Sequence, residues 1–215
     1  MSKKNRGSLI ILSGPSGAGK GTIHNELLKH DSNLKYSISM TTRKPRPGEV
    51  EGVDYFFVTE EEFKKEIEKD SFLEYAEVHG NYYGTLKKVV EKDLDDGYDV
   101  ILEIDIQGAL NIKAKKTDGI FIFIMPPSMR ELKNRLVNRG TETKEKLIER
   151  FKNAYKEVNE MSKYNYVVIN DELDLAVKKV EAILIAERCR VDRIEEFDVN
   201  NQEELIHELL VDFNK

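Results

Sequence analysis

The chain of 215 residues has too few cysteines for an internal disulfide, no surplus of basic residues and no long apolar run. Its single cysteine, Cys189, has no second cysteine to pair with, which predicts a reducing, cytoplasmic setting. The 34 basic and 40 acidic residues give a net charge of −6, which argues against nucleic acid as the main partner, because binding to a phosphate backbone needs a basic surplus. The apolar run at residues 9–12 is too short for a signal peptide or a membrane span, so no membrane partner is expected.

The apolar residues that are present form short runs separated by helical patterns. They make up 40% of the chain, enough for a real core, and the length allows one domain, or one domain with insertions. Continuous apolar runs predict strands that are buried on both faces, as in a parallel sheet covered by helices, and such runs lie at 8–12, 99–104, 120–124 and 166–169. Helical patterns at about 19–30, 128–140, 144–160 and 172–190 alternate with them, which predicts an α/β fold with right-handed crossovers.

Two parts of the chain depart from this alternation. Residues from about 37 to 92 are rich in Thr, Arg, Pro, Gly and Tyr, with a short strand-like piece at 54–58 before a capping box, Thr59 with Glu62. This composition predicts an inserted, β-rich lobe. The acidic tail carries an apolar stripe near 202–213, which predicts a helix that packs on the domain or on a sister subunit. Whether the protein is a monomer or a homo-oligomer stays open.

A glycine-rich segment follows the first predicted strand directly and opens the first predicted helix. Gly14, Gly19 and Lys20 have the G-x-x-x-x-G-K spacing of the phosphate-binding P-loop. Glycines let successive N–H groups point into one concavity at a helix N-terminus, where the partial positive charge favours phosphate, and the lysine adds a full charge. The predicted nucleotide-binding residues are Gly14, Pro15, Ser16, Gly17, Ala18, Gly19, Lys20, Gly21 and Thr22.

The residue after the P-loop lysine differs from the general motif. The motif has Ser or Thr there to bind Mg²⁺, whereas this chain has Gly21. We therefore expect nucleotide oxygens and water to hold the ion, with Thr22 as a weaker candidate, and assign no protein metal ligand.

A second predicted strand brings carboxylates to the same edge of the sheet. Glu103 and Asp105 stand at its carboxyl end, where such proteins place an acid near Mg²⁺ or substrate. Asp105 and Gly108 also match the D-x-x-G of GTPases, but the chain has no N-K-x-D element to read a base, which argues against a GTPase.

A second anion site is predicted between residues 35 and 47, which hold four basic residues and no acidic one. Arg43 and Arg46 can each donate a forked pair of hydrogen bonds to a phosphate group. Ordinary solvated arginines beside a proline-rich turn are the alternative, which these residues alone leave open. The basic residues are Lys35, Arg43, Lys44 and Arg46, and tyrosine hydroxyls are offered by Tyr55, Tyr82 and Tyr83.

Several ordered segments closely resemble guanylate kinases: SMTTRKPRPGE at 39–49, GVDY at 52–55 and GNYYGT at 80–85. The P-loop, LEIDIQG at 102–108 and RGTET at 139–143 match as well, so the resemblance covers about residues 8–190. It implies a P-loop nucleoside monophosphate kinase fold in three layers that transfers a phosphoryl group from ATP to GMP or dGMP with Mg²⁺. The division that we expect is a parallel-sheet core at 1–36, 93–127 and 161–193, a GMP-binding lobe at 37–92, a helical lid at 128–160 and an acidic helical extension at 194–215.

The resemblance also implies roles for individual residues. The GMP phosphate is held by Arg43, Arg46, Tyr55 and Tyr83. The guanine is faced by Ser39, Glu74, Thr85 and Asp105, with Glu103 nearby, where the family often has Asp. The adenine of ATP is contacted by Asn170 and Asp171. The residues expected to act in catalysis are Lys20, Arg43, Arg135, Arg139 and Arg150.

Guanine selectivity has a physical basis in Glu74. One ionised carboxylate can accept hydrogen bonds from N1–H and N2–H₂ of guanine together, whereas adenine presents an acceptor at N1 and has no amino group at C2. A site built to bond a group rejects an analogue that lacks it by as much as ~10⁴–10⁵. Without the resemblance, Glu74 would be an ordinary surface glutamate.

Two other functions stay open at this point. Guanylate-kinase-like domains exist that bind proteins without catalysis, typically with a degraded P-loop, and the intact Gly14, Gly19 and Lys20 favour the enzyme. A kinase for another nucleoside monophosphate is the second alternative, against which Glu74 is the argument.

Overall fold

The structure is a computed structural model that describes residues 6–78, 80–115, 118–138 and 144–193, together with 206, 207 and 210. The chain divides into two compact units, residues 1–181 and 182–215, and each is considered by itself. In the described ranges no helix is long and apolar enough to cross a membrane. The predicted helix near 202–213 falls outside the described residues except at Ile206, His207 and Leu210, which are helical.

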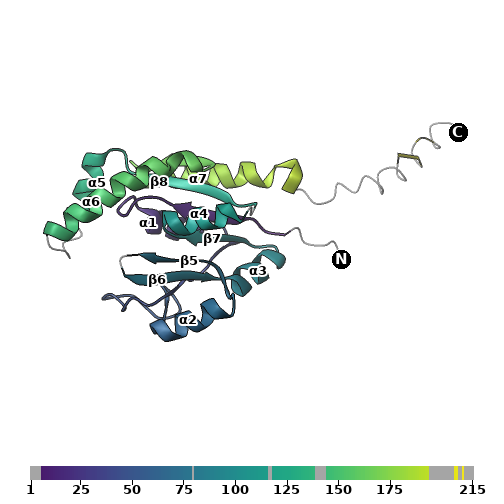
Figure 1. Ribbon diagram of the computed structural model, residues 1–215. Helices are drawn as coiled ribbons and strands as arrows, with labels where there is room; N and C mark the ends of the chain where they lie inside the picture. The colour runs from purple at the N-terminus through teal and green to yellow at the C-terminus, as the bar shows by residue number, and fades with distance from the viewer. Residues whose placement is uncertain are drawn as a thin grey trace. The chain divides into compact units, whose positions relative to one another are not determined.

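A five-stranded parallel sheet with the order β2-β7-β1-β8-β9 forms the centre of the first unit (Figure 1). Strands β1, β7 and β8 are buried along almost their whole length, as their continuous apolar runs predict. The prediction that strands are buried on both faces is wrong for β9, where Val167 is 47% and Ile169 46% exposed. The reason is that β9 is the last strand of the sheet. The bounds are β1 Leu9–Ser13, β2 Leu34–Tyr36, β7 Asp99–Glu103, β8 Ile120–Met125 and β9 Tyr166–Ile169.

Helices connect these strands and cover the sheet. Ala109 and Ile112 of α4 pack with Val90 of α3 in one apolar cluster with Ile11 and Leu102 of the sheet. Another cluster joins the neighbouring helices α5 and α6. The alternation of strands and helices is confirmed, although the sequence patterns did not predict β2, α3 or α4. The bounds are α1 Lys20–His30, α3 Lys87–Asp95, α4 Ile106–Ala114, α5 Met129–Asn138, α6 Lys144–Val158, η1 Asn159–Lys163, α7 Leu173–Arg188 and η2 Val191–Arg193.

The inserted region contains a second, four-stranded sheet with the order β4-β3-β6-β5. Side chains alternate between its faces, so Tyr82 stacks on Phe63 of α2 while Tyr83 meets Tyr55 edge to face. The strand predicted at 54–58 is shorter, because Asp54 accepts the N–H of Val50 and closes a turn. The capping box of α2 is confirmed. The bounds are β3 Met40–Thr41, β4 Phe56–Phe57, α2 Glu60–Glu68, β5 Phe72–Val78 and β6 Asn81–Leu86.

Candidate active site

The glycine-rich loop between β1 and α1 has a backbone that only glycine adopts readily. Gly14 and Gly19 have φ values of 144° and 94°, and Gly19 is the N-cap of α1. A Cβ at Gly14 would lie 2.1 Å from the carbonyl oxygen of Ile124, and one at Gly19 would lie 2.3 Å from Nδ2 of Asn170. The loop is therefore fitted between β8 and the chain that follows β9, with its N–H groups at the positive end of α1.

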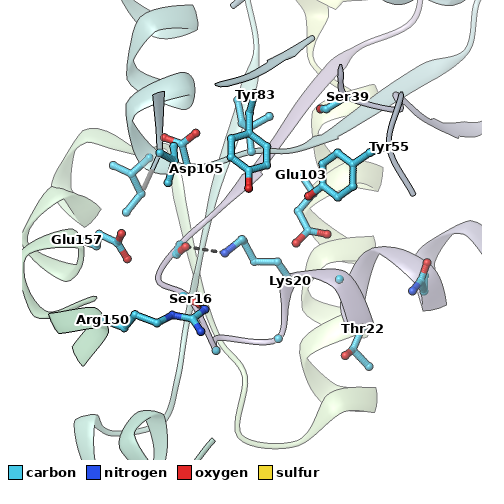
Figure 2. Close-up of a pocket in the computed structure, with 18 of the residues that line it drawn as sticks. Ser16, Lys20, Thr22, Ser39, Tyr55, Tyr83, Glu103, Asp105, Arg150 and Glu157 are labelled. Carbon is cyan, nitrogen blue, oxygen red and sulfur yellow. Dashed lines mark hydrogen bonds between the residues drawn. The ribbon is translucent and has the colours of Figure 1, made fainter. Parts of the chain in front are cut away.

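The P-loop lysine lies at the centre of the cleft that this loop borders. Lys20 Nζ donates to the carbonyl oxygen of Gly14 at 2.7 Å, so its side chain folds over the loop (Figure 2). Glu103 of β7 and Asp105 lie on either side of it in the close-up (Figure 2). Because the carboxyl ends of β1 and β7 meet at this edge, one cation and two carboxylates border the same space.

A cleft of about 460 Å³ runs from the P-loop to the second sheet. Residues from α1, β7, α6 and the inserted sheet share its walls, which brings together most of the site predicted from the sequence. The predicted residues in its walls are Gly14, Ser16, Gly17, Gly19, Lys20, Gly21, Thr22, Ser39, Arg46, Tyr55, Glu74, Tyr83, Glu103, Asp105 and Arg150.

Glu74 of β5 is a buried carboxyl group in the wall of this cleft. It is 3% exposed and its Oε1 accepts a hydrogen bond of 2.9 Å from Oγ1 of Thr85 on the neighbouring strand. Burial raises the pKa of Glu74 to about 7, the Thr85 bond acts in the opposite direction, and the nearby charge of Asp105 raises it further. The group is therefore poised to ionise near neutral pH when donors approach it.

The turn after β7 explains why Asp105 and Gly108 stand three residues apart. Asp105 is the N-cap of α4, and its Oδ1 accepts the N–H groups of Gln107 and Gly108. A Cβ at Gly108 would lie 2.5 Å from Oε2 of Glu74. In this chain the D-x-x-G pattern therefore has two structural roles. Asp105 caps helix α4, and Gly108 leaves room for the carboxylate of Glu74.

The predicted anion site already contains an internal carboxylate. Glu49 accepts a 2.8 Å bond from Arg43 and a 2.7 Å bond from the backbone N–H of Arg46. Burial alone would lower the pKa of Arg43, but its bond to Glu49 raises that pKa. Lys35 is not part of this site, because it pairs with Asp93 at 2.6 Å. The positive charge expected between residues 35 and 47 is thus partly balanced by an acid just beyond that range.

Two tyrosines border the same cleft as Arg46. Their rings lie 6.0 Å apart in an edge-to-face arrangement, Tyr55 from the chain before β4 and Tyr83 from β6 (Figure 2). Burial raises the pKa of Tyr55 to about 12, helped by the charge of Glu103. Tyr55 therefore stays a neutral hydroxyl donor at neutral pH.

The arginines of the two helices after β8 differ in their reach. Arg150 of α6 enters the cleft and donates a 2.7 Å bond to Oγ of Ser16 in the P-loop. Arg135 of α5 instead bonds Glu131 and, at 3.0 Å, the carbonyl oxygen of Asn170. Arg139 lies outside the described residues. Of the predicted lid arginines in the described ranges, the structure brings Arg150 to the cleft and holds Arg135 behind it.

The other predicted residues in the described ranges do not line the cleft. Asn170 donates to the carbonyl oxygen of Ala18 at 2.8 Å, so it braces the P-loop backbone. Asp171 accepts the N–H of the next residue and is exposed. Within the P-loop, the N–H of Ala18 donates to the carbonyl oxygen of Pro15. Arg43 bonds Glu49, and Thr85 bonds Glu74.

The cleft also contains residues that the sequence analysis missed. Glu157 enters it from α6, seven residues after Arg150 and hence two turns along the same helix face, a spacing that could have revealed it. His24 lies behind the wall and bonds Glu103 at 2.7 Å. The sequence could have indicated His24, because it follows Lys20 by four residues and therefore lies on the same face of the predicted helix. Glu49 had none, because its bonds to Arg43 and Arg46 depend on the folded turn.

The parallel sheet, the phosphate-binding loop and the polar side chains of the inserted sheet in the same cleft define the class of protein as a P-loop kinase of a small anionic substrate. The family model for guanylate kinase matches residues 6–187. Guanylate kinase of Clostridium perfringens is 62% identical over 210 residues, covering 98% of this chain and 97% of that protein. Guanylate kinase of Caldanaerobacter subterraneus is 59% identical over 206 residues, covering 96% of this chain and all of that protein.

The same family appears among solved structures. The crystal structure of guanylate kinase from Anaplasma phagocytophilum superposes with a TM-score of 0.76 at 35% identity, over 92% of this chain and 94% of that one. The chain belongs to the guanylate kinase family.

Proposed function

We propose that the protein transfers the γ-phosphoryl group of ATP to GMP or dGMP, with Mg²⁺, giving ADP and GDP or dGDP. The observation that carries the proposal is that one cleft of about 460 Å³ has the P-loop in one wall and the buried carboxyl group of Glu74 in another. A phosphate cradle and a guanine-reading group therefore face the same space, which is the requirement for direct transfer between two nucleotides.

ATP is assigned to the P-loop side. The N–H groups of residues 14–22 and the N-terminus of α1 receive the phosphates, and Lys20 exchanges its bond to Gly14 for phosphate oxygens. Asn170 and Asp171 lie next to this loop, and we assign the adenine to their side. Asn170 supports that position through its bond to Ala18.

GMP is assigned to the inserted sheet. Glu74 accepts N1–H and N2–H₂ of guanine while Thr85 holds its other side, and Ser39 and Asp105 border the same space. The GMP phosphate meets Arg46, Tyr55 and Tyr83 directly. Arg43 joins them from its bond with Glu49, with donors in its fork still available to a phosphate.

The chemistry requires that two anions be brought together. The acceptor phosphate is already anionic near neutral pH, so no general base is needed and catalysis consists of positioning and charge stabilisation. Lys20 from the P-loop and Arg150 from α6 provide positive charge at the point where the phosphates meet. We assign residues 128–160, including Arg135 and Arg139, to a lid and residues 37–92 to a lobe that close over this point and exclude water.

Mg²⁺ is proposed to arrive with ATP. The described residues contain no group of three or more His, Cys, Asp or Glu side chains that could hold a metal. Mg²⁺ does not require such a cage, because it commonly binds substrate phosphates, water and one or two carboxylates. The carboxylate of Glu103 and the hydroxyl of Thr22 line the cleft beside the P-loop, so this oxygen-donor set fits the ion. When bound, the ion neutralises charge on the β- and γ-phosphates.

An acceptor panel tests the proposal. GMP, dGMP, AMP and UMP are compared with Mg-ATP in a coupled assay of ADP release, with the wild type and Lys20→Ala. We expect turnover with GMP and dGMP and at least a ~10³-fold loss in Lys20→Ala, because the lysine contacts the transferred group. A preference for AMP would overturn the assignment of Glu74. Absence of any turnover in well-folded protein would favour a protein-binding domain instead.

A further inference from the structure

The carboxylate at the end of β7 is held from the neighbouring helix. Nδ1 of His24 in α1 lies 2.7 Å from Oε2 of Glu103. An ionised carboxylate accepts hydrogen bonds and donates none, so Nδ1 carries the proton of this bond. Glu103 lines the main cleft and also a second cleft beside it. His24 and Tyr36 line this second cleft as well. The bond therefore ties a side chain that borders both spaces to α1.

His24 has little freedom to move. It is 8% exposed, and its ring stacks on that of Tyr36 in β2, with centroids 4.5 Å apart and planes 7° from parallel. A stacked ring packed between α1 and β2 keeps one orientation, which fixes the direction of the Nδ1–H bond. The imidazole is therefore a rigid support for a side chain, Glu103, that has three rotatable bonds of its own.

Gly21 leaves the space that this arrangement uses. It precedes His24 by three residues, so the two lie on one face of α1. A Cβ at Gly21 would be 3.4 Å from Oε2 and 3.8 Å from Oε1 of Glu103. The carboxylate thus lies in van der Waals contact with the point where a side chain of residue 21 would begin. A larger residue there would compete with Glu103 for the first turn of α1.

We propose that His24 is a positioning residue that holds the Glu103 carboxylate against the first turn of α1, in the space left by Gly21. Its effect on rate rests on the proposed function, because Glu103 acts there on the bound phosphates and their cation. The placement also accounts for a glutamate at this position: its extra methylene, compared with aspartate, carries the carboxylate to the helix, where His24 receives it.

Substitutions at His24 separate positioning from packing. His24→Leu removes the donor, and His24→Asn keeps an N–H donor near the place of Nδ1. A matched control exists on the same helix, where His30 makes a 2.8 Å bond to Glu181 but is exposed and lines neither cleft. We expect His24→Leu to lower kcat by about tenfold or more, since a ~1 Å misplacement can cost up to ~10². KM for GMP changes less, His24→Asn recovers most of the loss, and His30→Leu behaves as wild type.

A double-mutant cycle with Glu103→Gln decides the question. If His24 acts through Glu103, His24→Leu costs less than about twofold in kcat once Glu103 is Gln, whereas independent effects would multiply. Multiplying effects, or a wild-type kcat in His24→Leu, would overturn the proposal. Isotope-edited NMR of the His24 ring in nucleotide-free protein gives a readout without turnover: a protonated Nδ1 whose signal shifts in Glu103→Gln supports the bond, and no shift refutes it. If the wild-type protein shows this His24–Glu103 hydrogen bond but does not phosphorylate GMP, the proposed function is refuted and the positioning of Glu103 by His24 is not.

Discussion

At the scale of single residues, the carboxyl group of Glu74 combines two demands that oppose each other. Burial raises its pKa from 4.5 to about 7, and the charge of Asp105 adds to the effect. In the proposed function, however, guanine is read by the ionised form, which accepts two N–H groups. Under that proposal, binding of GMP lowers this pKa and releases a proton at and below neutral pH, while burial of the carboxyl group reduces the stability of the nucleotide-free protein at neutral pH.

The pH dependence of GMP binding follows from this pKa. As the pH falls through 7, Glu74 becomes protonated in the unliganded protein, and KM for GMP is expected to rise by up to about tenfold per pH unit. In Glu74→Gln this dependence disappears, and preference for GMP over AMP falls. Steady-state kinetics between pH 5 and 8 measure both. Because the phosphate of GMP itself titrates near pH ~6, the difference between wild type and variant is the quantity to compare.

The raised pKa of Glu74 should also affect the stability of the nucleotide-free protein, in the opposite direction: stability falls as the pH rises, whereas GMP binding improves. The folded pKa of Glu74 lies above the unfolded value, so its favourable contribution is complete below about 4.5 and is lost as the pH rises through about 7. The loss amounts to about 3 kcal/mol in the free energy of unfolding. Glu74→Gln, which keeps an acceptor for Thr85, is therefore expected to gain stability relative to wild type as pH rises. Urea unfolding at pH 5 and 8 tests this, and a constant gap would contradict it.

At the scale of elements, the first turn of helix α4 leaves space for Glu74, a residue of strand β5. A Cβ at Gly108 would approach Oε2 of Glu74 to 2.5 Å, although alanine is otherwise favoured in a helix. Gly108→Ala is expected to displace Glu74 and to raise KM for GMP by roughly 10-fold or more, as overpacking costs about 1–3 kcal/mol. The affinity for an ATP analogue stays unchanged. Gln107→Ala, which adds no atoms toward Glu74, is the control, and equal effects in both variants would refute this reason for the glycine.

Helix α6 brings a positive charge to the P-loop from a separate part of the chain. Arg150 reaches Ser16 at 2.7 Å, and its helix packs with α5 through an apolar cluster. Arg150→Met is expected to lower kcat by about 10³ or more with a much smaller change in KM, because the charge acts on the transferred phosphoryl group. Lys152→Met, two positions away on the exposed side of α6, should leave kcat unchanged. Pre-steady-state quench experiments would show whether the transfer step itself is slowed.

The elements that sequence patterns predicted are those whose signals are local. β1, the P-loop and α1 follow one another within a short stretch, and each carries its own signature in residues 9–30. Glu74 was assigned only through the family resemblance, because its surroundings come from Thr85 and Gly108, which no local pattern connects to it. Helices α3 and α4 were missed for a different reason: each is only nine residues long, so the helical spacing of apolar residues repeats over little more than two turns. The bond between Glu49 and the predicted anion site likewise required the folded turn.

At the scale of the first unit, the two sides of the cleft belong to different parts of the fold. The P-loop lies on the parallel sheet, whereas Tyr83 and Glu74 belong to the four-stranded sheet, which carries α2 on its other face (Figure 1). A nucleotide held by only one of these parts has no contact that favours their approach. Two nucleotides that share a transferable phosphoryl group have contacts with both, and with Arg150 of α6 as well. Closure should therefore depend on the joint presence of acceptor and donor.

Small-angle scattering of the full chain measures this coupling. We expect the radius of gyration to fall when GMP and a non-hydrolysable ATP analogue are present together, and to fall less with either alone. AMP in place of GMP serves as the control, because its base lacks the groups that Glu74 accepts, so compaction should be smaller at the same concentration. In Arg150→Met the compaction should be reduced, since one of the three connections is removed. An unchanged radius with both nucleotides bound would mean that the cleft is already in its reactive form, and that water is excluded by the nucleotides rather than by movement of the protein.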